Sequence, residues 1–124
     1  MGLENLKPHQ RSGSWTPAFT NLVNLDGAPT VLSAKFGIVG NLVTFHLRLT
    51  VDPTASAAAS FDFSVPVIPQ SDFGDANSLA GTSATLTTVG VASSVAASKT
   101  AVLNWTASAG TAETLVCVGS YLLP

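Results

Sequence analysis

His46 and Cys117 are the side chains of this sequence best suited to catalysis, given the acids and serines elsewhere in the chain. His46 could act as a general base for a serine nucleophile if an acid such as Asp62 oriented its ring. No Gly-x-Ser-x-Gly elbow or comparable motif supplies that serine, however. The second histidine, His9, lies in a polar stretch near the N-terminus. We therefore interpret His46 as a solvated side chain and expect no catalytic residues.

Cys117 is the only cysteine, so no disulfide can form within the chain. It lies in the apolar stretch LVCVGSY. A thiol becomes reactive when it is accessible and its pKa is lowered, and an apolar stretch favours neither condition. We predict a buried, structural thiol.

Metal ligands are equally scarce. A zinc site uses several His and Cys side chains, and the chain has two histidines and one cysteine. The loop SDFGDANS offers oxygen ligands for calcium in Asp72, Asp75 and Asn77. Their spacing does not match the EF-hand pattern, and the same residue types are common in turns. We expect no metal site and no cofactor, and leave open whether this loop binds an ion.

The clearest structural element is the stretch from residue 42 to residue 51, which carries His46. Val43, Phe45, Leu47, Leu49 and Val51 alternate there with polar side chains. Successive side chains of a strand point to opposite faces of the sheet. The alternation therefore predicts an antiparallel strand with one face in the core and the other in solvent.

Short apolar runs separated by turn residues continue along the chain, at the spacing typical of a sandwich or barrel. They predict about eight strands, at residues 15–25, 30–36, 42–51, 60–65, 78–89, 91–97, 99–106 and 114–123. Residues 37–41 would form a tight connection and residues 66–77 a long loop. We expect one all-β domain over residues 14–124, a jelly-roll-like antiparallel β-sandwich. Residues 1–13 would precede it as an extended N-terminal arm.

The composition leaves little charge for the surface of this domain. Charged residues make up 10% of the chain, against roughly 25% in an average domain, and apolar residues make up 46%. The last predicted strand is apolar on both faces, with Val116, Val118 and Leu122 opposite Leu115 and Cys117. Such a strand is either central in a sandwich or covered by a neighbouring subunit. The low charge of the chain favours coverage by a neighbouring subunit. We expect a homo-oligomer, most simply a trimer.

Two classes of partner are disfavoured. The five cations are scattered, whereas nucleic-acid binding draws on clustered contacts to phosphates. No apolar run reaches the roughly 18 residues of a membrane span, and the N-terminus lacks the apolar core of a signal peptide. We expect neither a nucleic-acid partner nor a membrane partner.

Four segments carry a resemblance to a known family: SGSWTPAFTNL (residues 12–22), FGIVGNLVTFHLRLTVD (36–52), SFDFSVPV (60–67) and VGSYLL (118–123). In this order they resemble the small β-sandwich modules at the surface of tailed-bacteriophage virions. Those modules start with G-x-W-T-P, continue with (Y/F)-x-x-(V/I)-G-N-x-V and close on G-S-Y. The chain departs from them where Ser64-Val65-Pro66 replaces a Gly-Leu-Pro segment. The family is structural, so the resemblance supplies no catalytic residues.

The resemblance implies one of two roles on a virion. Such modules act as capsid decoration (cement) or head-fibre proteins, and they also form the tips of tail fibres. A short arm in place of a long fibre shaft favours a decoration protein, made in the host cytoplasm and bound to the outer capsid surface. The expected partners are the major capsid protein and further copies of the chain. The expected contact residues are Leu3, Leu6, Lys7, Arg11 and Trp15.

Two alternatives stay open at this point. The first is a receptor- or glycan-binding tip of a tail fibre or spike. It predicts that Asp72, Phe73 and Asn77 are exposed together at one end of the domain. The second is an enzyme, such as a depolymerase that uses Asp62 or His46.

Overall fold

The computed structural model describes residues 10–69 and 72–123, and all regular secondary structure in these residues is β. The strands are β1 (Gln10–Ser14), β2 (Phe19–Val23), β3 (Thr30–Val39), β4 (Leu42–Val51), β5 (Ala58–Ser64), β6 (Leu79–Ala84), β7 (Val89–Ser94), β8 (Thr100–Thr106) and β9 (Glu113–Leu122). The all-β prediction is confirmed. The described residues contain nine strands, where the sequence predicts about eight.

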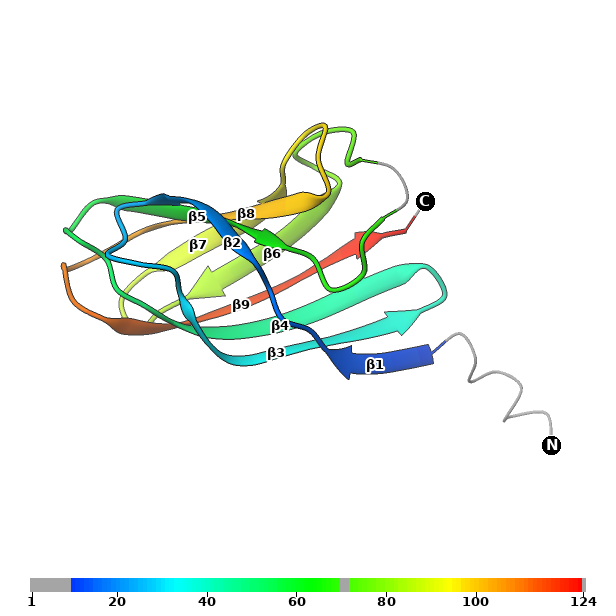
Figure 1. Ribbon diagram of the computed structural model, residues 1–124, viewed down its shortest axis with the longest axis horizontal. Coiled ribbons are helices and arrows are strands. Elements are labelled where there is room, and N and C mark those ends of the chain that lie inside the picture. Colours follow the sequence, from blue (N-terminus) through cyan, green and yellow to red (C-terminus); the bar gives the residue numbers. More distant parts are fainter. Residues whose placement is uncertain (1–9, 70–71, 124) are drawn as a thin grey trace.

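All nine strands belong to one antiparallel sheet, in the order β1-β3-β4-β9-β6-β7-β8-β5-β2. The sheet curls into a half-barrel, so β4 and β9 lie across the interior from β5 and β8 (Figure 1). The central ladder pairs β4 with β9 over all ten residues of both strands, from Leu42 opposite Leu122 to Val51 opposite Glu113. This ladder positions His46, whose side chain lies on the outer face of the curl.

A short link between β1 and β2 connects the two edges of the sheet. β1 pairs with β3 at one edge and β2 pairs with β5 at the other, so the intervening residues 15–18 must cross the open side of the curl. The crossing is fixed at both ends by backbone hydrogen bonds. The Trp15 N–H donates to the Ala34 carbonyl at 3.2 Å, and the Ser64 N–H donates to the Ala18 carbonyl at 3.0 Å.

The core fills the concave side of the sheet. Along β4 the five residues from Val43 to Val51 at alternate positions are buried, as the sequence predicts. Phe45 is central to an aromatic cluster, with its ring centroid 6.2 Å from Trp15, 5.8 Å from Phe63 and 6.5 Å from Tyr121. Because Phe45 lies on β4 and Phe63 on β5, their contact spans the interior and joins the two sides of the half-barrel.

The strand boundaries differ from the sequence predictions at several places. Residues 10–13, assigned to the arm, pair with β3 and form most of β1. The tight connection expected at residues 37–41 is only a turn at Gly40, with φ of 61°, and Asn41, because Gly37 continues β3. The strand predicted at residues 78–89 ends at Ala84, where the N–H of Thr85 donates to the Thr88 carbonyl in a hairpin turn.

Candidate functional site

The structure places the five expected contact residues in three different ways. Leu3, Leu6 and Lys7 lie outside the described residues. Arg11 is exposed on the edge strand β1. Trp15 is half-buried and is used inside the molecule, because its ring packs edge-on against Phe45 and its Nε1–H donates to the Ser64 carbonyl at 3.0 Å. This geometry favours a structural role for Trp15 over a contact with a partner.

The structure does not assemble the residues considered for catalysis. His46 lies on β4 and Asp62 on β5, and four strands of the sheet separate them. Asp62 instead accepts a hydrogen bond from the Asn21 side chain at 2.8 Å. His46 and Asp62 each alternate with buried residues of their strand, so both point outward, on opposite sides of the half-barrel.

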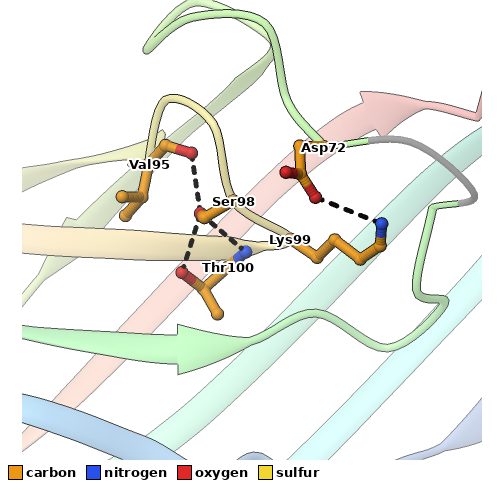
Figure 2. Close-up of polar contacts among 5 residues, drawn as sticks. All are labelled: Asp72, Val95, Ser98, Lys99 and Thr100. Atoms are coloured by element: carbon orange, nitrogen blue, oxygen red, sulfur yellow. Dashed lines mark hydrogen bonds and ion pairs between the residues drawn. The ribbon is translucent and has the colours of Figure 1, made fainter.

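The loop that follows β5 folds back onto the end of the half-barrel. Phe73 is only 5% exposed, and its ring meets that of Tyr121 edge-on at a centroid distance of 5.8 Å. Its N–H donates to the Ser98 carbonyl at 2.7 Å. Next to it, Asp72 pairs with Lys99 at 3.1 Å, and the Ser98 hydroxyl donates to the Val95 carbonyl (Figure 2). Phe73 therefore belongs to the core, and the glycan-binding alternative loses its exposed aromatic ring.

The same loop uses its acids for local hydrogen bonds. A carboxylate oxygen of Asp75 accepts from the Asn77 N–H at 2.8 Å and from the Ser78 hydroxyl at 3.3 Å. The buried hydroxyl of Ser94, which the sequence analysis did not single out, accepts from the N–H groups of Ser78 and Leu79 and donates to the Asp75 carbonyl. Among residues 10–69 and 72–123, no three His, Cys, Asp or Glu side chains are grouped as metal ligands.

Two titratable groups lie in the core of β9. Burial raises the pKa of Cys117 to about 12, so its thiol is protonated and inert at neutral pH, in agreement with the predicted structural role. Burial also raises the pKa of Tyr121 to about 12, although its hydrogen bond to Val67 acts in the opposite direction. The Tyr121 hydroxyl donates to the Val67 carbonyl at 2.7 Å and accepts from the Val67 N–H at 3.0 Å. It thereby ties the loop after β5 to the last strand.

The convex face of the sheet carries a depression that crosses five strands. Its floor is a row of short side chains paired across neighbouring strands: Ser12 on β1, Gly37 on β3, Thr44 on β4, Ser120 on β9 and Ala80 on β6. The next outward row on one side consists of Lys35, His46, Val118 and Thr82. The row on the other side consists of Val39, Leu42 and Leu122. We call this depression, with its two flanking rows, the outer trough.

The outer trough contains adjoining hollows rather than one deep pocket. A hollow of about 210 Å³ lies over β3 and β4, and one of about 530 Å³ lies over β4, β9 and β6. They share Thr44 and Phe45. A third hollow, of about 430 Å³, shares Ala80 and Ser120 with the second. The three shallow hollows therefore adjoin one another along the row of short side chains from Gly37 to Ala80.

Beneath the second hollow, β6 and β9 each have a glycine, so the backbone there carries no side chain. Gly81 and Gly119 are opposite each other in the ladder and both line this hollow. A Cβ at Gly81 would lie 2.5 Å from the Val118 carbonyl oxygen, and a Cβ at Gly119 would lie 2.6 Å from the ring of Phe45. Both positions therefore require glycine for close packing.

Charge and apolar surface are separated along the outer trough. Lys35, His46 and Arg48 point outward from β3 and β4. Within the described residues, β6 and β7 have no charged side chain, and the only one on β9 is Glu113, on the same face as the buried Leu115. The outer face of the three strands β9, β6 and β7 therefore has no charge.

Apolar side chains are exposed on that charge-free face. Val118 is 43% exposed, Val91 61% and Leu122 62%. Val118 and Val91 both flank Thr82 across the ladders, so their exposed surfaces are near neighbours. An apolar centre without charges, bordered by polar groups, is the composition found at the core of protein interfaces. The arrangement suits binding to another protein surface.

Within the described residues, no helix is long and apolar enough to cross a membrane. No family model matches the chain, and neither a curated protein nor a solved structure matches it.

Proposed function

We propose that this chain is a structural virion protein that decorates and stabilises a bacteriophage capsid by binding across capsid subunits. The observation that carries the proposal is the outer face of β9, β6 and β7, which presents Val118, Val91 and Leu122 without a charged neighbour on those strands in the described residues. A protein with this surface gains stability when a partner covers the apolar side chains. The placement on a virion is supported by the motifs around Trp15, Gly40 and Gly119 that resemble phage surface modules.

The mechanism of such a protein is mechanical. Each copy adds buried area between capsid subunits, and an interface of about 800 Å² per partner is enough for stable attachment. Many copies together raise the pressure that the shell withstands. The copies themselves associate, most simply as trimers, and residues 1–9 supply further contacts through Leu3, Leu6 and Lys7.

The alternative, a receptor- or glycan-binding tip, has less support. It depends on an exposed aromatic ring near Asp72 and Asn77, and Phe73 is buried against Tyr121 instead. The enzyme hypothesis requires His46 and Asp62 to act together across four intervening strands. We therefore favour a role in binding over one in recognition of sugars or in hydrolysis.

We also retain the jelly-roll-like β-sandwich as an interpretation of the curled sheet. It is supported by the packing of Phe45 on β4 against Phe63 on β5, with ring centroids 5.8 Å apart across the interior. Two opposed layers that share such contacts are the defining feature of a sandwich. A strand order beginning β1-β3-β4-β9 on one side and β2-β5-β8-β7 on the other would form those layers.

The test is binding to phage particles prepared without this protein. Purified protein should co-sediment with such particles and raise the temperature at which they release their DNA. Deletion of residues 1–9 should weaken binding while leaving β1, which starts at Gln10, in place. Absence of binding by the intact protein would overturn the proposal, as would a monomer in solution that shows no tendency to associate.

A further inference from the structure

We propose that the outer trough binds an extended segment of the partner protein that carries acidic side chains at one end and apolar side chains at the other. The inference rests on the proposed function, and it specifies the docking site and the chemistry of the partner.

The dimensions of the outer trough suit an extended chain. Its floor crosses five strands, from Ser12 on β1 to Ala80 on β6. Four steps of about 4.8 Å between neighbouring strands make it about 19 Å long. An extended peptide rises about 3.3 Å per residue, so about six residues fill it. The shallow floor of Gly37, Thr44 and Ser120 leaves space for a backbone and small side chains.

The cations at one end of the outer trough determine the charge of the occupant. Lys35 lies in a flanking row of the outer trough beside its cross-strand partner His46, and Arg48 lies just beyond this row, two residues after His46 on the same face of β4. Within the described residues, the salt bridge between Lys99 and Asp72 is elsewhere, and no acid is paired with Lys35 or Arg48. Carboxylates of a partner would therefore find unpaired cations here.

The other end of the outer trough requires apolar side chains. Val118 and Leu122 border the floor where it passes over β9, and both are exposed. No charged group of β6 or β9 lies on this outer face. Acidic residues over β3 and β4, followed by apolar residues over β9 and β6, match the surface in order.

Other occupants fit the same surface less well. A second copy placed face to face would bring its own Lys35 and Arg48 either onto the same two cations or, turned end to end, onto the charge-free half, and neither orientation places a carboxylate beside them. Residues 1–9 contain one acid, Glu4, and one lysine, Lys7, so they bring no net negative charge from their side chains. Nucleic acid would need phosphate contacts along the whole outer trough, and its β9 and β6 half has no cation.

The first experiment measures binding to phage particles prepared without the protein, using variants of the outer trough and of the adjacent Arg48. The double variant Lys35→Glu with Arg48→Glu should bind at least tenfold more weakly, since it replaces two attractions by two repulsions. Arg11→Glu is the control, because Arg11 is exposed on β1 but is paired with Ile38, whose row continues to the buried Val43 and so faces away from the outer trough. Its binding should stay within twofold of the wild type.

A second pair of variants tests the shape of the outer trough without changing charge. Ser120→Phe fills the floor over β9, and it should weaken particle binding at least tenfold. Thr114→Phe places the same ring on the same face of β9, six residues away, and it should bind like the wild type. Circular dichroism and unfolding curves show whether each variant keeps the fold, so a loss of binding is scored only for folded protein.

The third experiment does not depend on particles. The ¹⁵N-labelled protein is titrated with the peptide acetyl-Glu-Glu-Ser-Val-Val-amide and with the same peptide carrying Lys for Glu. The acidic peptide should shift the amide signals of Gly37, Thr44 and Ser120, and the basic peptide should not. Equal shifts with both peptides, a stronger effect of an oligothymidylate, or shifts confined to other residues would overturn the inference.

The outcomes separate the two proposals. If the wild type binds particles and the Lys35, Arg48 and Ser120 variants bind equally well, the inference fails and the proposed function stands. If the wild type does not bind particles but the acidic peptide maps to the outer trough, the proposed function fails and the inference stands. If neither binds, both fail.

Discussion

β4 and β9 are neighbours that share one ladder and one interior, yet their outer faces differ. Ten residues of each strand are paired, and both strands bury alternate side chains in the same core. Outside, β4 presents Thr44, His46 and Arg48, whereas β9 presents Val116, Val118 and Leu122. Strand pairing and core packing do not require this difference. We conclude that the inner faces of the two strands determine the fold, whereas the outer faces are available for function.

The largest effect should come from the shared interior. Phe45→Ala removes a buried ring that contacts Trp15, Phe63 and Tyr121. We expect a loss of about 3–5 kcal/mol in the free energy of unfolding, measured by urea denaturation. Thr44→Ala, one residue earlier on the outer face, should change it by no more than about 0.5 kcal/mol. If the two variants lose similar amounts of unfolding free energy, the buried and outer faces of β4 contribute equally to stability, contrary to this prediction.

A smaller loss should follow from adding a methyl group where β9 meets β4. Gly119→Ala would place its Cβ 2.6 Å from the Phe45 ring and 2.9 Å from the Ala80 carbonyl oxygen. We expect a destabilisation of about 1–3 kcal/mol from this overpacking. Gly27→Ala is the matched control, because its Cβ would meet nothing within 4 Å. Equal stability of the two variants would show that the β4–β9 contact is looser than described.

The hydroxyl of Tyr121 should contribute less than the packing of its ring. Tyr121→Phe keeps the ring beside Phe45 but removes both hydrogen bonds to Val67. We expect a cost of about 1–2 kcal/mol in thermal or urea unfolding, since two backbone groups lose their partner. Hydrogen exchange of the Val67 amide should accelerate as well. Unchanged exchange at Val67 would mean that other contacts hold this loop.

Alkaline pH should weaken the interior of β9 gradually. Burial raises the pKa of Cys117 from 9.0 to about 12 and that of Tyr121 from 10.0 to about 12. The unfolded chain ionises these groups first, so their contribution to stability is complete below pH 9 and is lost as the pH rises towards 12. We expect Cys117→Ala to reduce the pH dependence of the unfolding free energy between these limits. If the unfolding free energy of the variant falls as steeply with rising pH as that of the wild type, Cys117 does not contribute to this pH dependence.

The smallest effect on stability, but a clear one on association, should come from the outer face of β9. Val118→Ser removes an exposed apolar side chain from the charge-free face. We expect the free energy of unfolding to change by no more than about 0.5 kcal/mol. Particle binding should fall, and the contrasting change His46→Ser should also weaken it because it removes a ring N–H that can donate to a partner's carboxylate. If both variants bind particles as well as the wild type does, the outer faces of β4 and β9 do not form the binding surface.

The sequence predicted β4 accurately because a half-buried strand in solvent leaves a strict alternation in its own residues. Its bounds, Leu42–Val51, are confirmed. The prediction was wrong at Gly37, because a glycine can lie within a strand as well as in a turn, and Gly40 with its positive φ makes the turn instead. Phe73 could not be assigned from its polar neighbours, since its burial depends on a contact with Tyr121, far along the chain.

The outer trough could be predicted only in part. The polar face of residues 42–51 and the two apolar faces of the last strand were both visible in the sequence. The floor depends on the register that brings Gly37, Thr44, Ser120 and Ala80 into one row across four strands. Periodicity within one strand does not specify the register between strands, so the row and its hollows required the structure.

The link at residues 15–18 has a consequence for how the molecule responds to force. A pull on the N-terminal end of β1 must first detach this strand from β3, and then extract the indole of Trp15 from beside Phe45. Only then does the load reach β2 and β5 at the far edge. Peeling would thus pass two successive barriers, at β1 and at Trp15, before the opposite rim bears any load.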